Sequence, residues 1–308
     1  MDKKQQNIGI AFALIGSLLF STKAIFVKLS YQHHIDTISL LLLRMIFALP
    51  FYLFMIFREL GQKWQSWILI QKKYWLALVL SAIMGYYLSS LLDFLGLRYI
   101  GASVERLILF IYPTFIAIIS FFAFKEKVTW LQTGALALSY VGLLFVFGHN
   151  LGEITLDSDF WKGSFLILGC AVTFAIFLVM SQWLIPKFGA TSFTSISMTV
   201  ACLFVILHFL TTQKISGLFN YHLIVYVYAF SMATVATVIP SYVVNYAIQR
   251  IGATRSAILA SVGPISTISL AYLLLGERLL PAQLIGAVLV IVGVTVVSIE
   301  MKRKSKSA

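Results

Sequence analysis

Long apolar runs separated by short polar connections follow one another along almost the whole chain. A helix that crosses a lipid bilayer needs about 20 apolar residues, and ten runs meet this length. They predict transmembrane helices near 8–31, 35–57, 74–98, 101–123, 128–147, 161–185, 189–211, 221–249, 252–275 and 281–299. The connections are too short for a soluble domain. The pattern therefore predicts an all-α membrane protein with ten transmembrane helices.

The longest connection, 58–73, contains two tryptophans. Tryptophan is enriched where a membrane meets water, so this segment is predicted to lie along the interface. The composition agrees with a membrane protein: 60% of the 308 residues are hydrophobic and 11% are charged, whereas soluble domains carry about 25% charged residues. The lipid bilayer is therefore an expected partner.

The formal net charge of +12 does not indicate a nucleic-acid partner. The basic residues concentrate at predicted helix ends and in the tail at 300–308, not on one amphipathic face. With the N-terminus in the cytoplasm, the cytoplasmic segments contain most of them, and the opposite connection "GHNLGEITLDSD" is acidic. This asymmetry predicts a multi-pass protein of the cell membrane with both termini cytoplasmic. The cytoplasmic basic residues are Lys3, Lys4, Arg58, Lys63, Lys72, Lys73, Lys125, Lys127, Lys187, Arg250 and Arg255.

The sequence also repeats itself. "YIGASVERLILFIYPTFIAIISFFAFKEKVTWLQTGALALSYVGLLFV" aligns without a gap with "RIGATRSAILASVGPISTISLAYLLLGERLLPAQLIGAVLVIVGVTVV", and Pro113 aligns with Pro264. The duplication predicts two units, 1–152 and 153–308. Each unit has five predicted spans, an odd number, so the second unit must enter the membrane from the opposite side. Inverted repeats are typical of secondary transporters, whose substrate site lies between the repeats near the middle of the bilayer.

Several motifs resemble the EamA-type members of the drug/metabolite transporter superfamily. They are "LLFSTKAIFVK" in the first span, Arg44 in the second, "LRYIGASVERLILFIYPTFIAIISFFAFKEK", and its counterpart "IQRIGATRSAILASVGPISTISLAYLLLGERL". The resemblance covers nearly the whole chain. It implies a ten-helix bundle with a central cavity and alternating access by rocking helices.

Charged residues within the predicted spans are candidates for function, since each costs about 2.5–3.5 kcal/mol on insertion scales. Helical rise places most of them in the outer half of the first repeat, with Arg44 deepest. In the second repeat, Val244, Ser256 and Ala257 occupy the positions that align with Asp93, Glu105 and Arg106. The second repeat therefore lacks these charges, so the fold itself does not require them. The charged residues are Lys23, Lys28, Arg44, Asp93, Glu105 and Arg106.

Glu105 and Arg106 are adjacent and should point about 100° apart, so we expect each to have its own partner. The predicted partners are Asp93 for Arg106 and Lys23 for Glu105. Three interpretations are open: structural ion pairs that fix helix packing, groups that line a cavity, or groups solvated near the outer surface. Arg44 is predicted to be a structural anchor.

Polar stripes mark two further spans. Tyr86, Ser90 and Asp93 share a face of the third span, and Tyr242 and Asn245 share a face of the eighth. Lipid cannot satisfy such stripes, so they should face a cavity or another helix. With Tyr112 and the charged groups, they complete the predicted set of substrate-binding or cavity residues: Lys23, Tyr86, Ser90, Asp93, Glu105, Arg106, Tyr112, Tyr242 and Asn245.

Pro113 and Pro264 are predicted structural residues. Each removes a backbone hydrogen bond and should kink its helix near mid-membrane, which frees the carbonyls of Leu109 and Ala260. The loop residues Glu126 and Glu277 are predicted to make capping or gating contacts.

Three functional classes compete. An enzyme would need a nucleophile or a metal set, and His33-His34 with Asp36 is only a weak metal signal, so we expect no enzyme, metal or cofactor. A channel would not need inverted halves. No GxxxxGK[ST] motif is present, so transport must follow a gradient, a coupling proton or an exchange ligand. The resemblance implies a secondary transporter, an exporter of small polar or amphipathic metabolites such as amino-acid-like compounds. The alternative is multidrug efflux of amphipathic cations.

Overall fold

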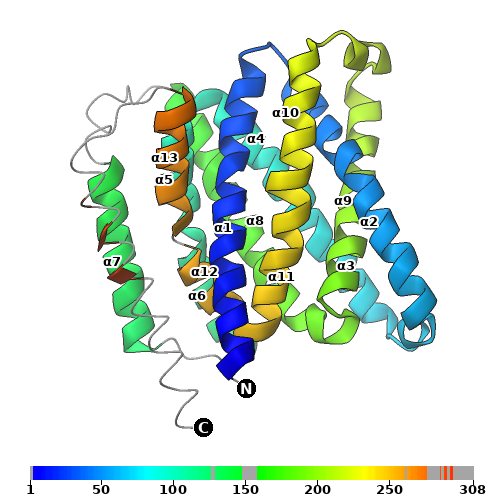
Figure 1. Cartoon of the computed structure of the whole chain (residues 1–308), viewed down its shortest axis with the longest axis vertical. Helices are drawn as coiled ribbons and strands as arrows, with labels where there is room; N and C mark the ends of the chain where they lie inside the picture. Colours follow the sequence, from blue (N-terminus) through cyan, green and yellow to red (C-terminus); the bar gives the residue numbers. More distant parts are fainter. Residues whose placement is uncertain are drawn as a thin grey trace.

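A computed structural model describes residues 3–125, 129–147, 158–260 and 262–275, with isolated helical positions at 285, 288, 289, 292 and 293. Within these residues the secondary structure is helical, with no strand (Figure 1). The first half contains α1 (Lys3–Tyr31), α2 (Thr37–Ile68), α3 (Lys72–Ala82), η1 (Ile83–Leu88), α4 (Ser89–Tyr99), α5 (Ala102–Leu109), α6 (Tyr112–Phe124) and α7 (Trp130–Phe147). The second half contains α8 (Ser158–Phe188), α9 (Ala190–Thr212), η3 (Ile215–Phe219), α10 (Leu223–Ala233), η4 (Thr234–Val238), α11 (Ile239–Ile251), α12 (Ala253–Leu259) and α13 (Val262–Leu275).

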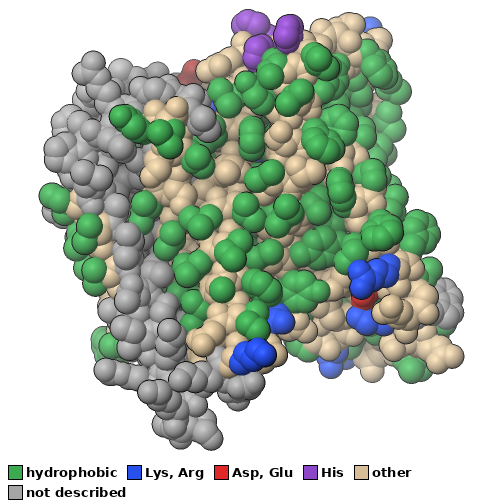
Figure 2. All heavy atoms as spheres, viewed as in Figure 1, with side chains coloured by type: hydrophobic (Ala, Val, Ile, Leu, Met, Phe, Trp, Pro, Cys, Tyr) green, Lys and Arg blue, Asp and Glu red, His purple; other side chains and the backbone are tan. Residues whose placement is uncertain are grey.

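Six described helices are long and apolar enough to cross a bilayer, which confirms a multi-pass membrane protein. They are Lys4–Tyr31, Thr37–Lys63, Lys72–Tyr99, Ser158–Phe188, Ala190–Thr212 and Leu223–Ile251. Apolar side chains are spread over the whole height of the described part of the visible face, and Lys and Arg gather mainly near the end where the N-terminus lies (Figure 2). The tenth predicted span, 281–299, lies mostly outside the described residues, as do Glu126 and Glu277.

The predicted span 101–123 is not one helix but two. α5 ends at Leu109 and α6 begins at Tyr112, with Pro113 in its first turn. Proline lacks the N–H that would bond the preceding turn, so the helix restarts at this point. The predicted span 252–275 is divided in the same way: α12 ends at Leu259 and α13 begins at Val262.

The connection predicted at 58–73 is mostly helical, because α2 continues to Ile68. Its last turns contain good helix formers and an ion pair one turn apart, Lys63 Nζ to Glu59 Oε2 at 2.6 Å. Such pairs stabilise a helix. The two tryptophans therefore lie in the last turns of α2, and the position of this segment at the interface stays a prediction.

The two halves pack against each other throughout. α1 contacts α11 and α13, while α8 contacts α4 and α6, and α2 contacts α9. α5 lies against α13 and α6 against α12, so the broken helices α5–α6 and α12–α13 run in opposite directions (Figure 1). Glycines allow the close approach of α4 and α8: a Cβ added at Gly96 would lie 3.3 Å from the carbonyl oxygen of Gly163. Small residues at such crossings are characteristic of packed membrane helices.

Asp36 caps the start of α2. Its Oδ1 accepts hydrogen bonds from the N–H groups of Ile38 and Ser39, each at 3.0 Å. Its Oδ2 accepts one from the Tyr221 hydroxyl at 2.8 Å, which ties this end of the first half to the second. Burial raises the pKa of Asp36, but the hydrogen bonds from Ser39, Tyr221 and Ile38 outweigh it and hold the pKa below the ordinary value.

We expect Asp36→Ala to lower the free energy of unfolding by about 0.5–2 kcal/mol, since it removes a helix N-cap. A depressed carboxyl pKa stabilises the protein above the ordinary pKa of about 4, and this contribution is lost as the pH falls below it. The whole decrease in unfolding free energy caused by Asp36→Ala should therefore be seen at neutral pH. SDS unfolding followed by tryptophan fluorescence measures it, with Asp36→Asn as the control that keeps a capping oxygen. An alanine variant as stable as the parent would contradict the role.

Candidate functional site

A cavity of about 110 Å³ lies inside the bundle and is lined by residues of both halves. Its charged lining residues are Lys23, Arg44 and Arg106. The rest of the wall combines hydroxyl groups with apolar and aromatic side chains. The volume is enough for several water molecules or one small ligand.

Irregular helix segments shape this cavity. Tyr86 comes from the π-helical turn η1, and Thr237 comes from the π-helical turn η4. Such turns interrupt the regular stagger of side chains and are frequent at functional sites. Leu109 and Tyr112 flank the break between α5 and α6, and Ala260 lies at the break before α13; all three also line the cavity. The departures from regular helix in both halves therefore meet at one place.

Serines of α1 bond to backbone carbonyls at the α12–α13 break. The Ser17 hydroxyl donates to the Ala260 carbonyl at 2.6 Å, and the Ser21 hydroxyl donates to the Gly263 carbonyl at 2.8 Å. The sequence predicted that Ala260 would have a free carbonyl, but a neighbouring helix supplies the missing donor. Inside a membrane such compensation is needed wherever a helix is interrupted.

The four charged groups of the predicted cluster do come together, but in other pairs than predicted. Lys23 Nζ lies 2.8 Å from Asp93 Oδ2, and Arg106 Nε lies 3.2 Å from Glu105 Oε2. The prediction of Asp93–Arg106 and Lys23–Glu105 pairs is wrong. α1 packs against α4, so Lys23 reaches Asp93. Arg106 has a long stem that bends back to its neighbour in spite of the angle between adjacent residues.

The cations and the carboxylates of this cluster have different environments. Lys23 and Arg106 line the cavity, and Arg106 Nη2 also donates to the Phe20 carbonyl at 3.0 Å. Asp93 and Glu105 are both 0% exposed, and their carboxyl groups interact directly with each other behind the cations. Among the described lining residues there is no acidic side chain. The cavity wall is therefore positive where it is charged.

Arg44 is the third cation of the wall. It is 3% exposed, and its guanidinium carbon lies 4.9 Å from the centre of the Phe94 ring. Its Nε and Nη2 atoms are buried and have no hydrogen-bond partner among the described residues. No described carboxylate lies within 4.0 Å of it. A role as a structural anchor stays a prediction, but this side chain lies at the cavity and not in a closed ion pair.

The remaining predicted residues divide between the wall and the layer behind it. Tyr86, Ser90 and Tyr112 line the cavity. Asn245 is buried behind Tyr86 and donates to the Tyr86 hydroxyl at 3.1 Å and to Thr194 Oγ1 at 2.8 Å. The Tyr242 and Ser195 hydroxyls share a hydrogen bond at 2.7 Å, away from the cavity.

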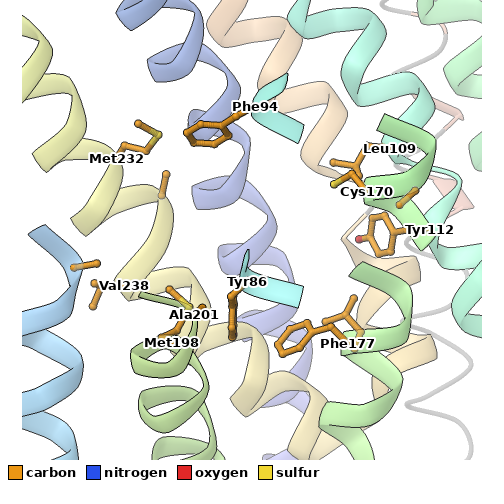
Figure 3. Close-up of a cluster of buried hydrophobic side chains, with 14 of the residues drawn as sticks. Tyr86, Phe94, Leu109, Tyr112, Cys170, Phe177, Met198, Ala201, Met232 and Val238 are labelled. Atoms are coloured by element: carbon orange, nitrogen blue, oxygen red, sulfur yellow. The ribbon is translucent and has the colours of Figure 1, made fainter. Parts of the chain in front are cut away.

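Aromatic packing supports this layer. Tyr86 packs against Phe177 with their ring centres 4.5 Å apart, and Tyr112 lies beside Leu109 and Cys170 (Figure 3). Ser17 and Ser21 of α1 also line the cavity, although they were not among the predicted cavity residues. Their spacing of four residues, which places both on one helix face, was the signal that could have identified them.

Contacts between the halves close the bundle at both ends. At the end opposite the N-terminus, the His33 and His222 rings stack with centres 5.8 Å apart, beside the Asp36–Tyr221 hydrogen bond. At the N-terminal end, Ser192 donates to Glu59 Oε2 at 2.7 Å. Within the described part of the chain, no three metal-ligating residues gather around a possible metal site.

Comparisons with known proteins agree with a transport protein. The sequence model of the EamA-like transporter family matches residues 7–148 and again residues 161–299. The uncharacterized transporter YcbK of Bacillus subtilis is 32% identical over 92% of this chain and 90% of its own length. The uncharacterized transporter sll1319 of Synechocystis is 23% identical over 95% of this chain and 94% of its own. A solved crystal structure superposes with a TM-score of 0.76 at 14% identity, covering 98% of this chain and 99% of that one, which supports the fold.

Proposed function

This chain belongs to the EamA-like transporter family, and from this premise we propose that it is a secondary transporter that exports small polar or amphipathic metabolites, such as amino-acid-like compounds. The observation that carries the proposal is the cavity of about 110 Å³, lined by helices of both halves in the middle of a membrane bundle. A site between two halves can be exposed first to one side and then to the other.

We further propose that the protein has ten transmembrane helices in two inverted five-helix units, 1–152 and 153–308. In the gapless alignment that matches Ile100 with Ile251, the first residue of η1, Ile83, matches the first residue of η4, Thr234. The breaks after α5 and α12 coincide to within one residue in this alignment, since Leu109 aligns with Ala260 and α12 ends at Leu259. The helix contacts are reciprocal, α1 with α11 and α13 and α8 with α4 and α6. The opposite directions of α5–α6 and α12–α13 support an inverted relation between the units.

The orientation that we propose has both termini in the cytoplasm. Lys and Arg gather mainly near the end of the bundle where the N-terminus lies (Figure 2), which is the asymmetry that the positive-inside rule requires. Reporter fusions after Gly152 and at the C-terminus test it. A cytoplasmic signal after Gly152 would contradict two units of five spans.

In this proposal, alternating access proceeds by rocking of the two halves. The His33–His222 stack and the Asp36–Tyr221 bond would separate when the cavity opens outward. The Ser192–Glu59 bond would separate when it opens inward. Efflux of amphipathic cations is the less favoured alternative, because the charged groups of the described wall are cations and the carboxylates lie behind them.

The test is substrate flux in proteoliposomes that contain the purified protein. Metabolite profiling of cells with and without the gene supplies the panel of compounds. We expect flux of at least one small metabolite that depends on the protein and saturates with concentration. The absence of protein-dependent flux across a broad panel would contradict a transporter of either kind.

The same experiment tests a coupling proton. Glu105 is the candidate carrier, since Arg106, Asp93 and Lys23 all act on its carboxyl group and no acidic residue occupies the aligned position of the second repeat. We expect Glu105→Gln to fold normally and to lose the response of flux to a pH gradient. A stable Glu105→Gln protein with unchanged pH dependence would leave an exchange ligand as the driving partner.

A further inference from the structure

We propose that Arg44 binds the carboxylate of the transported compound, so that the ligand of this cavity is a small organic anion. This inference rests on the proposed function and narrows it to a class of substrate. The starting observation is a cation at the cavity wall, 3% exposed, whose Nε and Nη2 atoms have no hydrogen-bond partner among the described residues.

Arg44 differs from the other two cations of the wall. Lys23 is paired with Asp93 at 2.8 Å, and Arg106 is paired with Glu105 at 3.2 Å, so each already has a counter-charge. Arg44 has no described carboxylate within 4.0 Å: it stacks on the ring of Phe94 at 4.9 Å, and the Asp93 carboxylate, already paired with Lys23, acts on it from a greater distance. The face of an aromatic ring attracts a cation but does not neutralise it.

A buried guanidinium without a counter-ion is costly, because the desolvation of a charge is offset only by close and well-oriented partners. The cavity is the space from which a counter-charge can come. A carboxylate fits it best, since its two oxygens match the planar fork of an arginine and form two parallel hydrogen bonds. Lys23 and Arg106 turn the positive ends of their ion pairs toward the same cavity, and no acidic side chain is found among the described residues of its wall.

The other lining residues of the cavity indicate which groups the rest of the ligand can have. Phe174, Leu178 and Met198 supply an apolar surface, and Tyr86 adds a phenol ring. The volume of about 110 Å³ limits the ligand to a small compound. These features favour a monocarboxylate with a compact apolar group. An amino group on the ligand is not required, since the described wall offers no acidic side chain for it.

Binding of two probes of equal shape and different charge tests the proposal. Isocaproate carries a carboxylate, and isocaproamide replaces it with a neutral amide of nearly the same size. Binding to the purified protein in detergent is measured by ligand-dependent thermal stabilisation and by calorimetry, in sulfate buffer. We expect isocaproate to bind and isocaproamide to bind at least about tenfold more weakly, because only the anion forms charge-assisted hydrogen bonds.

Three variants identify the residue. Arg44→Gln should weaken isocaproate binding by roughly 10- to 100-fold, the range for a hydrogen bond between charged groups. Arg44→Lys keeps the positive charge but loses the planar fork of the guanidinium, so its affinity for isocaproate should lie between those of the parent and of Arg44→Gln. Arg98→Gln is the matched control, since Arg98 is exposed at the end of α4 and should leave binding unchanged. If Arg44→Gln does not fold, Arg44→Lys and the two probes still decide the question.

Several results would overturn the inference. One is equal binding of isocaproate and isocaproamide. Another is unchanged isocaproate affinity in a folded Arg44→Gln protein. A third is thermal stabilisation by chloride to which isocaproate adds nothing and from which it does not displace the chloride. These results are separate from the transport test. Arg44-dependent binding of isocaproate without any flux would contradict the proposed function and leave this site in place. Flux of neutral or cationic compounds that is independent of Arg44 would contradict the Arg44 site and leave the proposed transport function in place.

Discussion

Replacing Lys23 with methionine is expected to lower the free energy of unfolding by about 3–5 kcal/mol, the cost of removing one partner of a buried ion pair. Methionine retains most of the length of the side chain but leaves the Asp93 carboxylate, which is 0% exposed, without the ammonium group at 2.8 Å. SDS unfolding of the purified protein, followed by tryptophan fluorescence, measures the loss.

Lys162→Met is a matched control for this change. Lys162 pairs with Asp159 at a similar distance, 3.0 Å, but their side chains are 57% and 60% exposed. A surface pair of this kind is worth about 0–1 kcal/mol. The exchange of Lys23→Asp with Asp93→Lys should restore part of the stability. Equal effects of Lys23→Met and Lys162→Met, or no recovery in the exchanged protein, would show that the buried pair does not stabilise the bundle.

The Gly85→Ala protein is expected to be less stable than the parent by about 1–3 kcal/mol, the typical cost of overpacking. Gly85 lies in the π-helical turn η1 and packs directly on Phe177 of α8. A Cβ at this position would overlap both the ring and the Cβ of Phe177, which is fixed to the backbone and cannot move aside. Because Gly85 and Tyr86 both line the cavity, ligand binding should fall as well.

Gly134→Ala provides the comparison for this substitution. Gly134 lies in α7, and no residue that the structure describes lies within 4 Å of the position that a Cβ would take there, so the added methyl group meets none of them. Alanine is the better helix former by roughly 0.5–1 kcal/mol, so this variant should be as stable as the parent or more stable. Both variants are compared by SDS unfolding. A Gly85→Ala protein that matches Gly134→Ala would mean that α8 moves away from η1 at little cost.

The membrane class and most helix positions could be predicted from local sequence, since a bilayer selects spans by length and apolar composition. The six long helices of the structure begin and end within a few residues of predicted spans, apart from the extension of α2 to Ile68. The positions of Pro113 and Pro264 marked the two interrupted helices for the same local reason. Proline changes the backbone wherever it stands.

The π-helical turns η1 and η4 had no signal in the sequence. No proline lies within either turn, and their hydrophobic pattern continues that of the flanking helix. A turn of this kind forms because neighbouring helices accept the inserted residue, as Phe177 accepts Gly85. That acceptance is a property of packing between segments far apart in the chain.

The sequence by itself determined which residues carry charge inside the membrane and that they belong to the first repeat. Only the tertiary structure decided how Lys23, Asp93, Glu105 and Arg106 pair, and that the cations face the cavity while the carboxylates lie behind them. Only the tertiary structure also separated Arg44 from these pairs. The reason is geometric: the partner of a side chain depends on the relative rotation and depth of helices distant in sequence, which hydrophobic patterns do not specify.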